Sequence, residues 1–166
     1  MWDISQFLSF CDIIYDISHK KELFFMICTF FGHRDVTVCV KARIRDVVLD
    51  LIRTGRVSKF LVGNNGNFDF YVQCVLEELK NDGVGASFDI VLSRVNEKAL
   101  SENQRETVFP EELEKSIPKF AISKRNDWLI KNSSILIAYV EHRFSNSSKL
   151  LEKAIKRGLE VINLAD

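Results

Sequence analysis

In the stretch Phe60-Leu61-Val62-Gly63-Asn64-Asn65-Gly66-Asn67-Phe68-Asp69-Phe70, a short apolar strand leads into a loop of glycines and asparagines and then into a helix. Such turns bind phosphate groups in α/β proteins, because glycine lets the backbone approach a ligand and the first helical turn offers free N–H groups. The stretch predicts an anion site at Gly63, Asn64, Asn65 and Gly66, with Asp69 placed to bind ribose hydroxyls. The alternative is a tight turn without a ligand, since a single Gly-x-x-Gly turn is a weak motif.

A second loop of the same kind lies upstream, where Gly32-His33-Arg34-Asp35 follows the apolar run Leu23 to Phe31. If both runs are parallel strands, both loops leave the same edge of one sheet, which is where ligands bind in open parallel sheets. His33 and Arg34 carry donors suited to an anionic group. The two loops together therefore predict one binding site, although Arg34 could instead be a solvated surface cation.

Strands and helices are expected to alternate along the rest of the chain. The apolar run Leu23 to Phe31 suits a central strand that helices cover on both faces. Helical spacing of apolar residues predicts helices between the strands and after the last loops. The expected strands are 23–31, 59–62, 87–91, 135–140 and 161–164, and the expected helices are 40–52, a helix that follows the loop and ends at Asn81, 121–131 and 147–157. This alternation predicts a three-layer, right-handed, doubly wound α/β fold.

A long polar connection between Ser93 and Lys119 interrupts the alternation. Pro110 is expected to open a short helical turn there and Pro118 to close it. Connections of this length inside a compact domain usually serve as lids or are disordered.

Residues 1 to 20 stand outside the alternating pattern and predict an N-terminal helix with Asp3 as its cap. One reading packs this helix on the sheet edge. The other makes it a dimerisation or partner helix, because Phe10, Ile13 and Ile17 extend its apolar surface beyond one face. We therefore expect a homo-oligomer, and light scattering on the full chain would contradict this if the protein is monomeric at micromolar concentration.

The order of these motifs resembles the SLOG superfamily, most closely its small members that contain Gly-His-Arg. The resemblance rests on Gly32-His33-Arg34, on residues 62 to 69, and on Ala121 to Asn126 ahead of Ile135 to Val140, and it spans residues 23 to 165. SLOG domains include cytokinin-activating phosphoribohydrolases, the DNA-processing protein DprA and ligand-sensing domains of anti-phage systems. The resemblance implies a Rossmann-like, mainly parallel sheet of about five strands in a domain of residues 21 to 166, preceded by the N-terminal helical extension.

The resemblance also implies a pocket for nucleotide-derived ligands, to which two further segments would contribute. Arg125 and Asn126 open a helix at the same sheet edge, where cations oppose the helix dipole unless an anion is near. The segment after the fourth expected strand holds Glu141, His142, Asn146, Ser147 and Ser148. SLOG proteins usually have glycine and small residues here, so either the ligand lies further from the backbone or side chains replace main-chain donors. Capping of the helix is the alternative role for Ser147.

Catalysis has less support in these residues. The Pro-Gly-Gly-x-Gly-Thr-x-x-Glu stretch of the phosphoribohydrolases has no counterpart, so their enzymatic residues cannot be transferred. Glycosidic cleavage commonly uses two carboxylates, and Asp69 and Glu141 are the pair that the motifs place near the pocket. His19, His33 and His142 lack the spacing of a metal site, and no Walker loop occurs. We expect neither a metal nor a cofactor.

Composition describes one soluble domain of 166 residues with 23 basic and 23 acidic side chains. The zero net charge disfavours nucleic acid and anionic membranes as partners. The four cysteines include no Cys-x-x-Cys pair and are expected to be reduced thiols. No apolar run reaches the roughly 20 residues that cross a bilayer, and no signal peptide opens the chain, so we expect a cytoplasmic protein.

These observations predict non-catalytic binding of a nucleotide-derived signal, such as an ADP-ribose-type or cyclic nucleotide. A sensor or a sequestering protein in phage–bacterium conflict would use such a site. The alternatives are a hydrolase or transferase acting at an N-glycosidic bond, and a partner-binding module that uses the N-terminal helix. The expected ligand-binding residues are Gly32, His33, Arg34, Gly63, Asn64, Asn65, Gly66, Asp69, Arg125, Asn126, Glu141, His142, Asn146, Ser147 and Ser148.

Overall fold

A computed structural model describes residues 26–94, 106–142 and 144–165. The expected N-terminal helix lies outside the described residues, as does the apolar surface from which the homo-oligomer was predicted. Both stay predictions. None of the described helices is long and apolar enough to cross a membrane.

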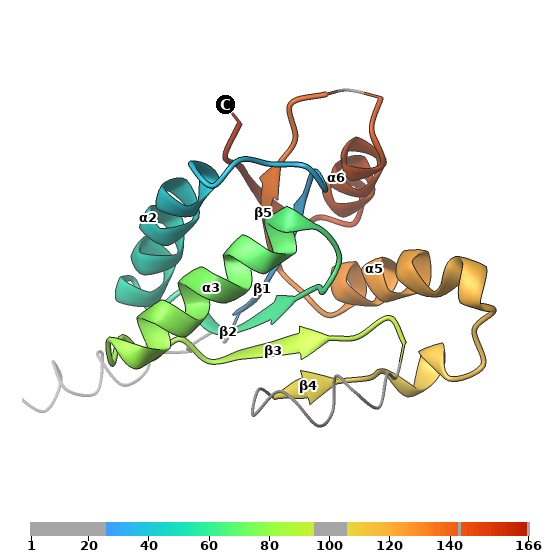
Figure 1. Cartoon of the computed structure of the whole chain (residues 1–166), viewed down its shortest axis with the longest axis horizontal. Helices are drawn as coiled ribbons and strands as arrows, with labels where there is room; N and C mark the ends of the chain where they lie inside the picture. Colours follow the sequence, from blue (N-terminus) through green and yellow to red (C-terminus); the bar gives the residue numbers. More distant parts are fainter. Residues whose placement is uncertain (1–25, 95–105, 143, 166) are drawn as a thin grey trace, which may run out of the picture.

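The described residues form one six-stranded sheet in which every strand pairs in parallel with its neighbours (Figure 1). The spatial order is β4-β3-β2-β1-β5-β6. The strands are β1 (Met26–Gly32), β2 (Val57–Val62), β3 (Phe88–Val91), β4 (Thr107–Val108), β5 (Ile135–Tyr139) and β6 (Glu160–Asn163). The predicted α/β fold is confirmed, with one more strand than expected.

Helices cover both faces of the sheet. Side chains point alternately to opposite faces along each strand, so neighbouring residues of one strand pack against different helices. Phe30 and Phe60 belong to an apolar cluster with α2 (Val40–Arg53) and α3 (Asn67–Asn81). Their neighbours Phe31 and Leu61 belong to a second cluster with α5 (Ala121–Lys131) and α6 (Asn146–Lys156). Figure 1 shows the two helix pairs on opposite sides of the strands. The three-layer arrangement is therefore confirmed.

The connection between β3 and α5 differs in part from the prediction. Pro110 does precede a helical turn, η1 (Glu111–Leu113), but Pro118 begins a second turn, η2 (Pro118–Phe120), instead of closing the first. Proline suits this first position because its fixed φ fits a helix and its missing N–H has no helical partner there. Ahead of both turns, β4 adds two residues to the edge of the sheet beside β3.

The strand order reverses direction between β1 and β5. From β1 the chain adds β2, β3 and β4 on one side, and then crosses to add β5 and β6 on the other. The loops after β1 and β5 therefore diverge at the carboxyl edge of the sheet. Such a switch point is where open α/β sheets bind ligands.

Candidate functional site

A cavity of about 490 Å³ lies at this switch point. Its volume falls within the range of small-molecule sites in proteins, roughly 300–1,000 Å³. Nine of the predicted ligand-binding residues line it: Gly32, His33, Arg34, Asn65, Asp69, Arg125, Asn126, Asn146 and Ser147. Four segments that are distant in the sequence therefore meet at one site.

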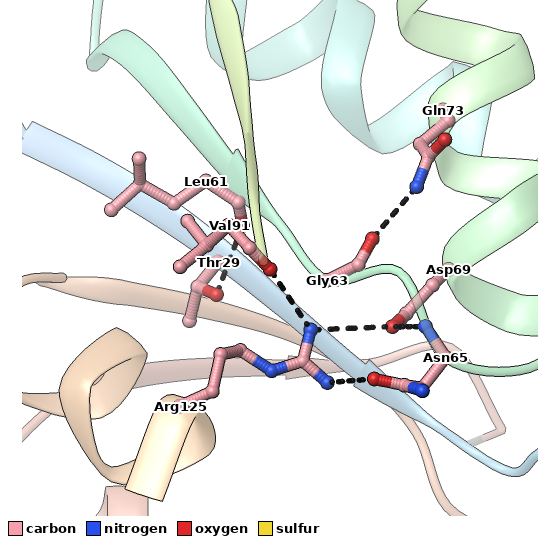
Figure 2. A network of polar contacts seen from close by, with 8 residues as sticks. All are labelled: Thr29, Leu61, Gly63, Asn65, Asp69, Gln73, Val91 and Arg125. Atoms are coloured by element: carbon pink, nitrogen blue, oxygen red, sulfur yellow. Dashed lines mark hydrogen bonds and ion pairs between the residues drawn. The ribbon is translucent and has the colours of Figure 1, made fainter. Parts of the chain in front are cut away.

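Arg125 is one of the residues that line this cavity, and its side chain is only 3% exposed. Its Nη2 donates to Oδ1 of Asn65 at 3.0 Å, and its Nη1 donates to the Val91 carbonyl oxygen at 3.5 Å (Figure 2). Nη1 also lies 3.8 Å from Oδ2 of Asp69. Within the described part of the chain, the buried Nε has no hydrogen-bond partner. The guanidinium therefore joins the ends of β2 and β3 to α5 without using all its donors.

Asp69 is buried in the first turn of α3, and its carboxylate accepts the backbone N–H of Asn65 at 2.9 Å. Burial raises the pKa of Asp69 above its ordinary value, although Arg125 and the Asn65 N–H oppose this shift. Burial likewise lowers the pKa of Arg125, against the attraction of Asp69. For both residues, the effect of burial on the pKa is thus larger than the effect of the attraction between the two charges. The predicted contact of Asp69 with ribose hydroxyls stays a prediction. In the structure its carboxylate already accepts a hydrogen bond from its own loop.

Gly63 does not line the cavity but leaves space for this ion pair. A Cβ at Gly63 would overlap Nη1 of Arg125 and Oδ2 of Asp69. The Gly63 carbonyl oxygen also accepts a hydrogen bond from Nε2 of Gln73 at 2.7 Å (Figure 2). The glycine therefore lets the two buried charged side chains approach the end of β2.

Gly66 brings the two glycine loops together. Its φ of +96° is favourable only for glycine, and a Cβ there would lie 3.0 Å from the backbone Cα of Arg34. The next residue, Asn67, donates its backbone N–H to the Arg34 carbonyl oxygen at 2.8 Å. The loop after β1 is thus attached to the N-terminus of α3, as the shared sheet edge predicted.

The loop after β1 is also held on its other side. The Gly32 carbonyl oxygen accepts the hydroxyl of Ser147 at 2.7 Å, and Nε2 of His33 accepts the backbone N–H of Glu141 at 3.1 Å. The His33 and His142 rings lie 5.3 Å apart between centroids. Hydrogen bonds to β5 and α6 segments therefore fix the position of His33 at the cavity wall.

The alternative role considered for Ser147, capping of the helix, is wrong. Ser145, and not Ser147, is the cap residue, and its Oγ accepts the backbone N–H of Ser148 at 3.0 Å. The helix begins at Asn146, one residue earlier than expected, so Ser147 lies within the first turn. Its hydroxyl is then free to bond Gly32 instead of the helix end.

Three other predicted residues lie elsewhere. Glu141, His142 and Ser148 line a separate cavity of about 610 Å³ beside Phe144 and Ile155. The Glu141 carboxylate accepts the hydroxyl of Tyr139 at 2.9 Å. Asp69 and Glu141 line different cavities, so the structure does not bring together the two carboxylates considered for catalysis.

The cavity also has an apolar wall that the motifs did not indicate, formed by Phe31, Ile122 and Leu150. Helical spacing could have found two of them. Ile122 lies three and four residues before Arg125 and Asn126, and Leu150 lies four residues after Asn146, so each shares a helix face with a predicted residue. Gly63, Asn64 and Gly66 complete the list of predicted residues that do not line the cavity. In the described ranges, no group of three or more His, Cys, Asp or Glu side chains could hold a metal ion.

Comparison with known proteins supports the fold at the level of structure. No family model matches the chain, and no curated protein matches it in sequence. The X-ray structure of DNA processing protein A (DprA) from Streptococcus pneumoniae matches with a TM-score of 0.63 at 16% sequence identity, over 85% of this chain. The match spans half of the DprA chain. The predicted Rossmann-like α/β fold is therefore confirmed as a fold.

Proposed function

We propose that the cavity at the switch point reversibly binds an anionic, nucleotide-derived small molecule. The observation that carries this proposal is the buried guanidinium of Arg125, whose charge is paired with Asp69 at 3.8 Å and whose Nε lacks a partner within the described residues. A buried cation of this kind is stabilised when an anion enters beside it. Arg34 at the cavity wall adds a second cation, against the single carboxylate of Asp69.

The polar and the apolar residues that line the cavity suit different parts of a nucleotide. Amide side chains of Asn65, Asn126 and Asn146 lie among the lining residues and can bind phosphate or ribose oxygens. The apolar wall offers a surface for a base. Since α3 and α6 begin at this edge, their N-termini favour negative charge here as well. The ligand we propose is therefore an ADP-ribose-type or cyclic nucleotide.

Sensing or sequestration is the role that we propose for this binding, in phage–bacterium conflict by analogy with other SLOG domains. Fold analogy supports that role and does not determine it. The zero net charge of the chain favours a small ligand over a nucleic-acid strand.

A thermal-shift panel of ADP-ribose derivatives, cyclic di- and trinucleotides and one single-stranded oligonucleotide tests the proposal. A ligand at 100 times its dissociation constant stabilises the native state by about 2.7 kcal/mol, which corresponds to roughly 5–10 °C in a domain of this size. We expect such a shift from at least one nucleotide and none from the oligonucleotide. Arg34→Ala should remove the shift, whereas Arg53→Ala, which replaces an exposed arginine at the end of α2, should retain it. A panel without any shift, or equal shifts for Arg34→Ala and wild type, contradicts the proposal.

The enzyme alternative is tested with the same ligand. A binder stabilises the ground state, whereas an enzyme must stabilise the transition state more strongly. The ligand should therefore be recovered intact after hours with stoichiometric protein, heat denaturation and liquid chromatography. Free base, ribose phosphate or a linearised product would support hydrolysis instead and would assign a catalytic role to Asp69. The partner-binding alternative rests on residues 1 to 20, outside the described residues.

A further inference from the structure

We infer that the ligand has two anionic parts and that the second part binds in a groove between α5 and α6. This inference rests on the proposed function of the first cavity. It narrows the ligand class to nucleotides with a second phosphorylated unit, such as ADP-ribose or a cyclic dinucleotide, and disfavours mononucleotides.

The groove directly continues the cavity. It has a volume of about 390 Å³ and shares four lining residues with the cavity: Ile122, Asn126, Asn146 and Leu150. Each helix therefore contributes one amide and one apolar side chain to both spaces. Figure 1 shows α5 and α6 on the same side of the sheet, and an ion pair between Lys153 and Asp127 at 2.6 Å links them. A ligand in the cavity can thus extend into the groove without leaving the protein surface.

Beyond the shared residues, four polar side chains line the groove. Ser123 and Asp127 come from α5, and Lys149 and Lys153 come from α6. Lys153 is already paired with Asp127. Within the described part of the chain, no ion pair involves Lys149, which is exposed. Lys149 is therefore available to an anionic group of the ligand.

The position of Lys149 on α6 supports this role. The first turns of α5 and α6 contain no acidic residue. Lys149 is the fourth residue of α6 and so lies next to the helix end that favours negative charge. An anion in the groove would interact favourably with both the lysine and the two helix N-termini. The groove thus has the chemistry for a second phosphate, next to a cavity that holds the first.

Isothermal titration with AMP, ADP-ribose and cyclic di-AMP tests the inference. We expect wild type to bind at least one of the two longer ligands about tenfold or more tightly than AMP, since one additional charged hydrogen bond contributes about that factor. Lys149→Gln should weaken binding of that longer ligand about fivefold to tenfold, Lys149→Glu should weaken it further, and both should leave AMP binding unchanged. Lys156→Gln, a control on the same helix, should behave like wild type for both ligands.

The outcomes separate the groove from the first cavity. Equal affinities for AMP and both longer ligands overturn the groove, and so does a Lys149→Gln protein that binds the longer ligands like wild type. In either case the first cavity stands if Arg34→Ala still abolishes binding of all ligands. Equal loss of AMP and of the longer ligand in Lys149→Gln also overturns it, because the lysine would then act in the cavity. Absence of binding by every nucleotide of the thermal-shift panel overturns the proposed function and the groove together.

Discussion

Replacement of Arg125 by alanine is expected to lower the free energy of unfolding by about 3–5 kcal/mol, the usual cost of removing one partner from a buried ion pair. The substitution leaves the carboxylate of Asp69 buried without its cation, while Asn65 and the Val91 carbonyl oxygen lose their donor. Urea unfolding followed by circular dichroism measures the effect. A loss below about 1 kcal/mol would mean that the pair is not buried in solution.

The cause of that loss can be separated from simple loss of packing. In Asp69→Asn/Arg125→Met both charges are removed, the Asn side chain can still accept the Asn65 N–H, and the Met side chain fills part of the space. We expect this double variant to be clearly more stable than Arg125→Ala, because no uncompensated charge stays buried. Equal stability of the two variants would assign the loss to packing alone.

The pH dependence of Arg125→Ala has a defined sign. Burial already raises the pKa of Asp69 in the native state, and loss of Arg125 removes a charge that lowers it. The native state then binds a proton more tightly than the unfolded state, in which Asp ionises at about pH 3.9. Stability should therefore fall as the pH rises through the native pKa of Asp69 and be regained on acidification. A variant equally destabilised across this range would contradict the assignment to Asp69.

Local patterns were sufficient to predict most of the fold. Apart from Thr29, the residues from Met26 to Phe31 are apolar because both faces of β1 are covered, and this feature is visible in the sequence. Helix ends at Asn81 and near Gly158 also follow from local chemistry. By contrast, β4 consists of only Thr107 and Val108, so no periodicity could reveal it.

The site was predictable as a set of loops but not as a set of contacts. Two glycine loops at one parallel sheet edge must meet, and the Asn67 to Arg34 hydrogen bond joins them. The pairing of Arg125 with Asp69 spans 56 positions in the chain and depends on where α5 packs, which no local pattern encodes. For the same reason the sequence could not tell that Glu141 and Ser148 line one cavity while Asn146 and Ser147 line another.

Gly32→Ala is expected to cost about 3 kcal/mol of stability, at the upper end of the range for overpacked cores, and to displace the loop that carries His33 and Arg34. A Cβ at Gly32 would overlap the ring of Phe68, which is 1% exposed and stacks on Tyr139 with 6.3 Å between ring centroids. The ring therefore has little room to move. Chemical denaturation and the thermal-shift panel measure the two effects.

Two comparisons identify steric overlap as the cause. Gly83→Ala introduces a side chain at a φ of +74° with no atom within 4 Å, so it should cost only the backbone strain of about 1 kcal/mol. A double-mutant cycle with Phe68→Leu should show that Gly32→Ala is less costly when the ring is absent. If the cost is the same with leucine at position 68, overlap with the ring is not the cause. If the Gly32→Ala/Phe68→Leu double variant regains stability but not ligand binding, the hydrogen bond between the Gly32 carbonyl oxygen and Ser147 is what positions the loop.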